Sequence, residues 1–386
     1  MRARLFLCLS LLSCCPAPAF AQGVSEECPT PGLAPAPSGV PDPELLRSHR
    51  FATGVGVQVA VIDTGVAEHP RLGTVIPGGD LIGGGGATGA LHDCDGHGTI
   101  VAGVIAARPA PDFGDSLIGV APDAEIIAIR QSSSVLRSPG NSSETAGTIG
   151  SLAEAISLAV DRGADVINVS LASCIPEHLA GTADTSVLDA ALHKAEAANV
   201  VVVAAAGNIG PACPEGSVSY PAASPTVLAV SASADSHTLA EYSLPTRNRP
   251  LSAPGSVLTG LSPTDAGFAS AMNSQQGPRP FTGTSFAAPV VSGMAAQLKQ
   301  RYPADTAAQI RAKLLAAASP GTGEIAPGSA LMQLDSAPVM QQVSVKAPKA
   351  ASTRTELRSM KVLLIFLGCA TALTLLVAAV RTLRFS

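Results

Sequence analysis

Charged and aromatic residues are scarce in this sequence. Asp, Glu, Lys and Arg make up 14% of the 386 residues, against about 25% in an average soluble protein, and tryptophan is absent. The formal net charge is −5, and no basic patch or aromatic ladder offers the surface that binding to nucleic-acid phosphates requires. We therefore expect no nucleic-acid partner, and we expect part of the chain to be shielded from water.

The sequence also lacks the short motifs of several cofactor sites. The glycine run at 83–86 is not followed by Gly-Lys-Ser/Thr, so it indicates a surface loop rather than a P-loop. No Cys-x-x-Cys pair is present, and His92 and His97 are not spaced as i, i+4 ligands on a helix. We predict no cofactor and no metal site.

The N-terminus has the pattern of a secretory signal. Two arginines precede an apolar run over residues 5–12, and small residues flank Phe20, where a signal peptidase reads the chain. We interpret residues 1–21 as a signal peptide. A loose lipobox ending in Cys14, which would then be lipidated, is the alternative cleavage site.

The C-terminus has the pattern of a membrane anchor. Residues 362–380 carry no charge and would span roughly 28 Å as a helix, close to the ~30 Å hydrocarbon core of a bilayer. We expect a transmembrane helix there, a flexible linker over 337–361 and a cytoplasmic tail over 381–386. Basic residues flank the helix on both sides, so the positive-inside rule does not determine its orientation in the membrane. The signal peptide instead predicts an extracytoplasmic body on the periplasmic side of the cell membrane.

The exported body is predicted to hold one α/β domain. Residues 22–44 form a proline-rich N-terminal extension, which should be extended and without a core of its own. From 45 to 336, near-continuous apolar strands alternate with helical patterns, which is typical of a parallel sheet covered on both faces. The expected strands are Val55–Asp63, Glu125–Arg130, Val166–Ser170, Val200–Ala205 and Val227–Ser231, and the expected helices are Gly98–Ala107, Ser151–Arg162, Thr185–Ala198 and Phe286–Arg301.

Four polar residues lie where ligands bind in such a sheet, beyond the strand ends and at helix starts. Asp63 and Asn208 each end an apolar strand, whereas His97 and Ser285 each open a helix. Ser285 would attack a carbonyl, His97 would move its proton, and Asp63 would hold the imidazole in the right tautomer. The Asn208 amide and the Ser285 N–H would bind the oxyanion. These are the parts of acyl transfer.

The order of the motifs points to one family. Asp-Thr-Gly, His-Gly-Thr, Ala-Gly-Asn and Gly-Thr-Ser-x-Ala-x-Pro follow one another along the chain, and the Gly-x-Ser-x-Gly elbow of α/β-hydrolases is missing. The sequence resembles the subtilisin-like (S8) serine peptidases. The resemblance implies a subtilisin-like three-layer α/β fold with a mostly parallel sheet, and a serine endopeptidase that acts on proteins or peptides.

Within that family, the sequence is most similar to the mycosins, the membrane-anchored subtilases of type VII secretion systems. The similarity rests on the signal peptide, the cysteine-bearing extension, Asp93-Cys94-Asp95 before His97 and the single C-terminal membrane helix. It implies processing of secretion substrates in association with the membrane subunits of the secretion complex. It also implies an alternative, a mainly structural role in that complex with proteolysis dispensable.

Three of the eight cysteines lie in the expected signal peptide and one lies in the expected membrane helix. The other four, which allow three pairings, would lie in the oxidising compartment: Cys28, Cys94, Cys174 and Cys213. Cys174 and Cys213 each follow a strand end at the same rim of the sheet, so we expect a Cys174–Cys213 disulfide. Cys28–Cys94 follows by elimination and would tie the extension beside the catalytic histidine, in keeping with an extension that wraps the body.

Substrate recognition is expected along two segments near Ser285, residues 170–172 and residues 205–207. In subtilases an extended peptide adds as a strand beside the first segment. The family usually has glycine where this chain has Ala172, whose methyl would narrow the path. The second segment forms a small, uncharged wall, which predicts apolar or small P1 residues. The expected substrate-binding residues are Ser170, Leu171, Ala172, Ala205, Ala206 and Gly207.

Overall fold

The structure is a computed structural model of the chain. It describes residues 28–83, 86–110, 114–138, 141–246, 250–275, 277–332 and 354–383. The expected signal peptide, 1–21, lies outside these residues. The chain divides into two units, with the boundary between residues 333 and 334. The first unit contains the site, and the second contains helix α9 (Arg354–Leu383).

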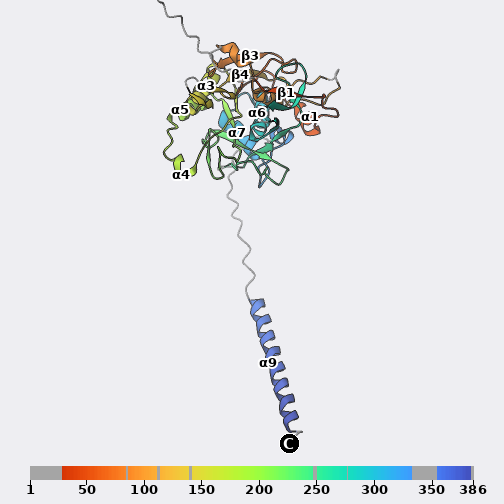
Figure 1. Cartoon of the computed structure of the whole chain (residues 1–386). Helices are drawn as coiled ribbons and strands as arrows, with labels where there is room; N and C mark the ends of the chain where they lie inside the picture. Colours follow the sequence, from red (N-terminus) through yellow and green to blue (C-terminus); the bar gives the residue numbers. More distant parts are fainter. Residues whose placement is uncertain are drawn as a thin grey trace, which may run out of the picture. The chain divides into compact units, whose positions relative to one another are not determined.

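A parallel sheet forms the centre of the first unit (Figure 1). In the described part of the chain it has seven strands, and every neighbouring pair is parallel. The α/β fold with a mostly parallel sheet is therefore confirmed. In spatial order the strands are β12 (Ser252–Pro254), β11 (Val227–Ser233), β9 (Val201–Ala205), β7 (Val166–Val169), β2 (Gln58–Asp63), β4 (Glu125–Arg130) and β3 (Val75–Asp80).

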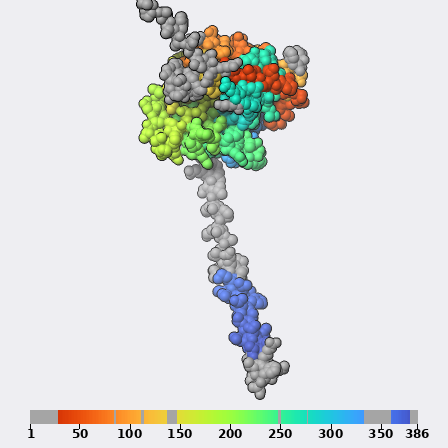
Figure 2. All heavy atoms as spheres, in the orientation of Figure 1, coloured from red at the N-terminus to blue at the C-terminus, as the bar shows by residue number. Residues whose placement is uncertain are grey.

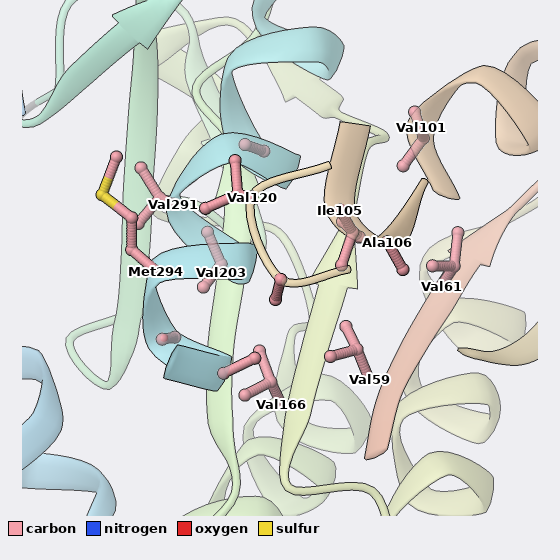
Figure 3. Close-up of a cluster of buried hydrophobic side chains, with 14 of the residues drawn as sticks. Val59, Val61, Val101, Ile105, Ala106, Val120, Val166, Val203, Val291 and Met294 are labelled. Atoms are coloured by element: carbon pink, nitrogen blue, oxygen red, sulfur yellow. The ribbon is translucent and has the colours of Figure 1, made fainter. Parts of the chain in front are cut away.

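The side chains of the strands alternate between two cores, as a strand buried on both faces requires. On β2, Val59 and Val61 point into the first core, whereas Ala60 and Ile62 point into the second. Figure 3 shows the first core, where Val59 and Val61 face Ile105 and neighbouring helical side chains. An uninterrupted apolar run is therefore needed over Val59–Ile62, and Asp63, the last residue of β2, is the first polar residue after it.

Helices cover both faces of the sheet. The first core is packed by α2 (His97–Ala106) and α6 (Thr284–Arg301), and the second by α3 (Ile149–Asp161) and α5 (Ser186–Ala197). Helices α2 and α6 also pack against each other, and their first residues, His97 and Thr284, line the same cleft. The other helices that the structure describes in this unit are α1 (Pro43–His49), α4 (Glu177–Ala180), α7 (Ala307–Ala317), α8 (Pro327–Leu331) and the 3-10 helix η1 (Ala87–Leu91).

The N-terminal extension contains a strand, which the sequence analysis did not predict. Strand β1 (Thr30–Ala34) pairs antiparallel with β15 (Phe268–Ser274), and Figure 2 shows this segment in red on the surface of the body. The extension is thus part of an antiparallel sheet, because its backbone completes the open edge of β15. The other strands of that sheet are β13 (Ser256–Val257), β14 (Gly260–Leu261) and β16 (Gly277–Thr282). Two further pairs are β5 (Ser133–Ser138) with β6 (Asn141–Ala146), and β8 (Ser173–Ile175) with β10 (Val218–Tyr220).

Helix α9 is longer than the predicted membrane helix. It begins at Arg354, so the last eight residues of the expected flexible linker, 354–361, are helical. This part of the prediction was wrong because residues 354–361 contain no glycine or proline and are mostly good helix formers. Within α9, Met360–Ala378 is long and apolar enough to cross a membrane.

Candidate active site

The candidate base and the carboxylate that orients it meet at the carboxyl edge of the parallel sheet. Asp63 is fully buried at the end of β2, and His97 is the first residue of α2. Asp63 Oδ1 lies 2.7 Å from His97 Nδ1 and also accepts the Thr64 N–H at 2.8 Å. Asp63 Oδ2 is buried and has no hydrogen-bond partner in the described part of the chain. The Asp63–His97 bond fixes which ring nitrogen of the imidazole faces the cleft.

Glycine is required where these two elements approach each other. A Cβ atom at Gly98 would lie 1.9 Å from the carbonyl oxygen of Gly65, which is backbone and cannot move aside. The Gly98 N–H donates to the Thr64 hydroxyl at 3.0 Å. The glycine of the His-Gly-Thr motif therefore lets the end of β2 and the start of α2 pack directly together. Gly65 of the Asp-Thr-Gly motif makes room for another segment, because a Cβ atom there would lie 2.7 Å from the carbonyl oxygen of His92.

Ser285 and His97 lie in the same cleft, which has a volume of about 530 Å³. Ser285 is the second residue of α6, where backbone N–H groups have no partner within the helix. The Ser285 carbonyl oxygen accepts the Ser170 hydroxyl at 2.7 Å, which ties the start of α6 to the end of β7. No hydrogen bond joins the Ser285 hydroxyl to His97 among the described residues. Such bonds are often long in ligand-free enzymes and shorten when substrate binds.

Asn208 is held so that its amide N–H₂ group is left for a ligand. Asn208 Oδ1 accepts the Thr284 N–H at 2.9 Å and lies 3.0 Å from the Thr284 hydroxyl oxygen. A Cβ atom at Gly283 would lie 2.8 Å from Asn208 Nδ2, so a side chain here would displace the amide group. Asn208 Nδ2 makes no hydrogen bond within the part of the chain that the structure describes. With the Ser285 N–H, it forms a pair of donors on one side of the cleft.

Three carboxylates set the charge of His97. Burial by itself lowers the pKa of His97, but the negative charges of Asp63, Asp93 and Asp95 outweigh it and raise the pKa above its ordinary value. Burial also raises the pKa of Asp93 to about 6, against the effect of hydrogen bonds from Thr99 and Thr64. The site therefore favours the imidazolium form that a general base reaches after taking a proton.

The carboxylates near His97 bind groups of the protein itself. Asp93 accepts hydrogen bonds from Thr64 and Thr99, and Asp95 accepts them from Ser133 and Ser134. These contacts use the oxygens that a metal ion would need. Asp93 and Asp95 thus serve to hold loops around the site.

The cleft is lined by most of the residues expected to bind substrate. They are Ser170, Leu171, Ala172, Ala205 and Gly207. Ala206 does not line the cleft; it is buried and borders a second, small cavity together with Ser217 and Ser219. The expectation for Ala206 was wrong because successive side chains of an extended segment point in opposite directions, so Ala205 and Gly207 share one side and Ala206 takes the other.

Several lining residues were missed by the sequence analysis. Ser133 and Ser134 follow β4 at the carboxyl edge, and Arg279 and Phe281 come from β16. The position of the serines could have been found, since they follow a recognised strand that is adjacent to Asp63. Arg279 lies between Pro278 and Pro280, and Phe281 follows Pro280, in a strand that has no apolar alternation.

Both disulfides lie close to the site. Cys28–Cys94 ties the extension to the loop before His97, and Pro29 lines the cleft. Cys174–Cys213 joins two segments that also line it. The cleft therefore has covalent ties on two sides.

Comparison with known proteins agrees with this geometry. The model of the subtilase family of S8 peptidases matches residues 54–350. Mycosin-4 of Mycobacterium tuberculosis is 41% identical over 286 residues, which cover 70% of this chain and 62% of that protein. Mycosin-1 of the same organism is 37% identical over 332 residues, covering 77% of this chain and 72% of that protein. The chain thus spans less than two thirds of mycosin-4.

Solved structures give the same result. The crystal structure of MycP1 from the ESX-1 type VII secretion system has a TM-score of 0.72 and 34% identity, covering 83% of this chain and 92% of that chain. A chain in the structure of an intact ESX-5 inner membrane complex has a TM-score of 0.69 and 31% identity, covering 90% of this chain and 93% of that one. The likeness therefore covers the site as well as the sheet.

Proposed function

Because the chain belongs to the subtilase family, a family of serine endopeptidases, we propose that it cleaves peptide bonds with Ser285 as its nucleophile. His97 is the general base and Asp63 the residue that orients it. The observation that carries this proposal is the 2.7 Å contact between Asp63 Oδ1 and His97 Nδ1, at the edge of a cleft that Ser285 also lines.

The proposed reaction proceeds by two acyl transfers. His97 Nε2 takes the proton of the Ser285 hydroxyl as Ser285 Oγ attacks the substrate carbonyl, and it then gives that proton to the leaving amine. Water attacks the acyl-enzyme by the same route. In both steps the charge on the carbonyl oxygen is stabilised by Asn208 Nδ2 and the Ser285 N–H, which are in place before substrate binds.

The substrate is a protein or peptide in an extended conformation. Ser170, Leu171 and Ala172 offer backbone groups at the side of the cleft, and Ala205 and Gly207 offer a small, uncharged wall for the P1 residue. Digestion of a peptide library should therefore yield apolar or small residues at P1. A library profile dominated by arginine or lysine at P1 would contradict this assignment.

The cellular role that we propose is processing of substrates of a type VII secretion system. The relatives include mycosins and a chain of an ESX-5 inner membrane complex, and Met360–Ala378 is suited to anchoring the chain in the same membrane. The catalytic unit then lies on the periplasmic side, and its partners are the membrane subunits of the complex.

A second candidate role is structural. It is favoured by the relatives that were solved within the ESX-5 inner membrane complex and its periplasmic assembly. A strain that carries Ser285→Ala separates the two roles. Continued export with loss of substrate processing supports a structural role beside proteolysis, whereas export that fails together with activity rejects it.

Labelling with a fluorophosphonate tests the nucleophile directly. The full chain with its disulfides intact should be labelled at Ser285, and labelling should be lost in Ser285→Ala and His97→Ala. Ser236→Ala is the matched control, because Ser236 is exposed and does not line the cleft. No labelling of the folded wild-type chain would refute the proposed chemistry.

A further inference from the structure

The cleft contains one exposed, permanently charged side chain among its described residues, that of Arg279. The other charged or titratable groups that line it are Asp95 and His97. Asp95 is only 8% exposed, and its carboxylate already accepts hydrogen bonds from Ser133 and Ser134. His97 is engaged with Asp63. The charge that a bound peptide can reach is therefore positive.

Arg279 is placed by a rigid element. It lies on β16, where it is paired with Met272 of β15, and Met272 lines the same cleft. Ser285 lies six residues after Arg279, just beyond the bend at Gly283. The position of the Arg279 backbone relative to the nucleophile is thus set by the sheet and not by a long loop.

The guanidinium group of Arg279 has a weak hydrogen-bond partner. Arg279 Nη1 lies 3.4 Å from Ser134 Oγ, which is a long distance for a hydrogen bond, and the acceptor is neutral. The same hydroxyl donates to Asp95. Arg279 therefore contacts the opposite wall through an acceptor that is already part of another bond.

A carboxylate is a better partner for this group than a shared hydroxyl. Hydrogen bonds between arginine and a carboxylate are charge-assisted and can be bidentate, and they strengthen as a bound peptide displaces water. A basic side chain at the same place would meet a like charge. We propose that Arg279 is a specificity-determining residue, which selects an aspartate or glutamate at one position of the peptide substrate. This inference rests on the proposed peptidase function.

A peptide library with randomised positions on both sides of the cleaved bond tests the inference, whichever subsite Arg279 faces. The products of the full-length, disulfide-intact enzyme are identified by mass spectrometry. The wild type should enrich acidic over basic residues by about fivefold or more at one position, the range of a partly exposed ion pair that binding desolvates. Arg279→Lys should keep the preference, Arg279→Gln should lose it and Arg279→Glu should invert it.

Two controls make the outcome unambiguous. Arg162→Gln removes an exposed arginine at the end of α3, away from the cleft, and should leave the library profile unchanged. Fluorophosphonate labelling of every variant reports a folded, reactive site. Labelled wild type that enriches no acidic residue, or an Arg279→Glu profile equal to that of the wild type, overturns the inference alone. Absence of wild-type labelling overturns the proposed function and the inference together.

Discussion

The Asp93 carboxylate accepts a hydrogen bond from the Thr64 hydroxyl, with 2.7 Å between Asp93 Oδ1 and Thr64 Oγ1. Thr64 follows Asp63, and Asp93 lies in the loop that leads to His97. The other carboxylate oxygen, Asp93 Oδ2, accepts the Thr99 N–H at 2.8 Å and the Thr99 hydroxyl at 2.6 Å. One buried carboxylate thus joins the two segments that carry Asp63 and His97.

Replacing Asp93 with asparagine should destabilise the fold and slow catalysis. Each Asp93 oxygen accepts two hydrogen bonds, so in either orientation the new amide N–H₂ group would face donors. An unsatisfied buried donor costs about 1–3 kcal/mol, and we expect the free energy of unfolding to fall by that amount. Urea denaturation measures the change in the free energy of unfolding, and kcat reports how well Asp63 still orients His97.

The matched control for this variant is Asp123→Asn. Asp123 is exposed, and its substitution should change the free energy of unfolding by less than about 0.5 kcal/mol. Equal stability of the two variants would show that the Asp93 network contributes nothing to the fold.

The pH dependence of activity should follow His97. A general base must be neutral to accept a proton, so kcat/KM should rise with pH as His97 loses its proton, with an apparent pKa above the ordinary 6.5 because of the surrounding carboxylates. Asp95→Asn removes one of these charges, lowers the pKa of His97 and should shift the rising limb to lower pH. The measurement is the pH profile of kcat/KM, with Asp123→Asn as the control; a limb that stays in place in Asp95→Asn contradicts the argument.

Residues at strand ends were the part of the site most open to sequence analysis. The run Val59–Ile62 is apolar at every position because both faces of β2 are buried, and so the carboxylate that follows it stands out. The same holds for Asn208, three residues beyond β9. Strand pairing through backbone hydrogen bonds produces a much weaker pattern of side chains in a sequence.

Two features of the molecule show why the rest could not be predicted. Strand β1 is held to β15 by backbone hydrogen bonds at a sheet edge, which impose no side-chain pattern on a proline-rich segment. Strand β16 likewise contains prolines, which are typical of edge strands and of loops alike. The wall of the cleft that carries Arg279 therefore emerges only from the three-dimensional structure.

Asn208→Asp should separate the two contacts of this side chain. Aspartate keeps an acceptor for the Thr284 N–H but has no donor for the oxyanion. Its negative charge would also repel the negative charge of the oxyanion. Loss of one oxyanion donor lowers kcat by about 10²- to 10³-fold, and we expect at least this decrease with little change in unfolding. Steady-state kinetics and thermal unfolding give the two readouts. Thr284→Ser retains both groups that hold Asn208 and should stay within a few-fold of wild type; a kcat for Asn208→Asp in that same range would exclude Asn208 from the oxyanion site.

The Cys28–Cys94 disulfide should anchor the extension more than it stabilises the core. The bridge joins residues 66 apart in sequence, and removing such a link costs about 2–4 kcal/mol, mainly by freeing the unfolded chain. Strand β1 is the outer strand of its sheet, so without the bridge its ladder with β15 is its main tie to the body. In Cys28→Ser/Cys94→Ser we therefore expect a lower free energy of unfolding and faster amide hydrogen exchange over Thr30–Ala34, with β2 and β9 still protected.

Cys369→Ser is the control, since Cys369 is unpaired and lies in α9 of the second unit. It removes a thiol without opening a loop, and it should leave exchange over β1 unchanged. Equal exchange over β1 in the wild type and in Cys28→Ser/Cys94→Ser would mean that the β1–β15 ladder holds the extension by itself.

The same double variant should also change the cleavage of long peptides, because Pro29 lines the cleft. Labelling of Ser285 by a fluorophosphonate should change less, because that small reagent needs no extended binding path.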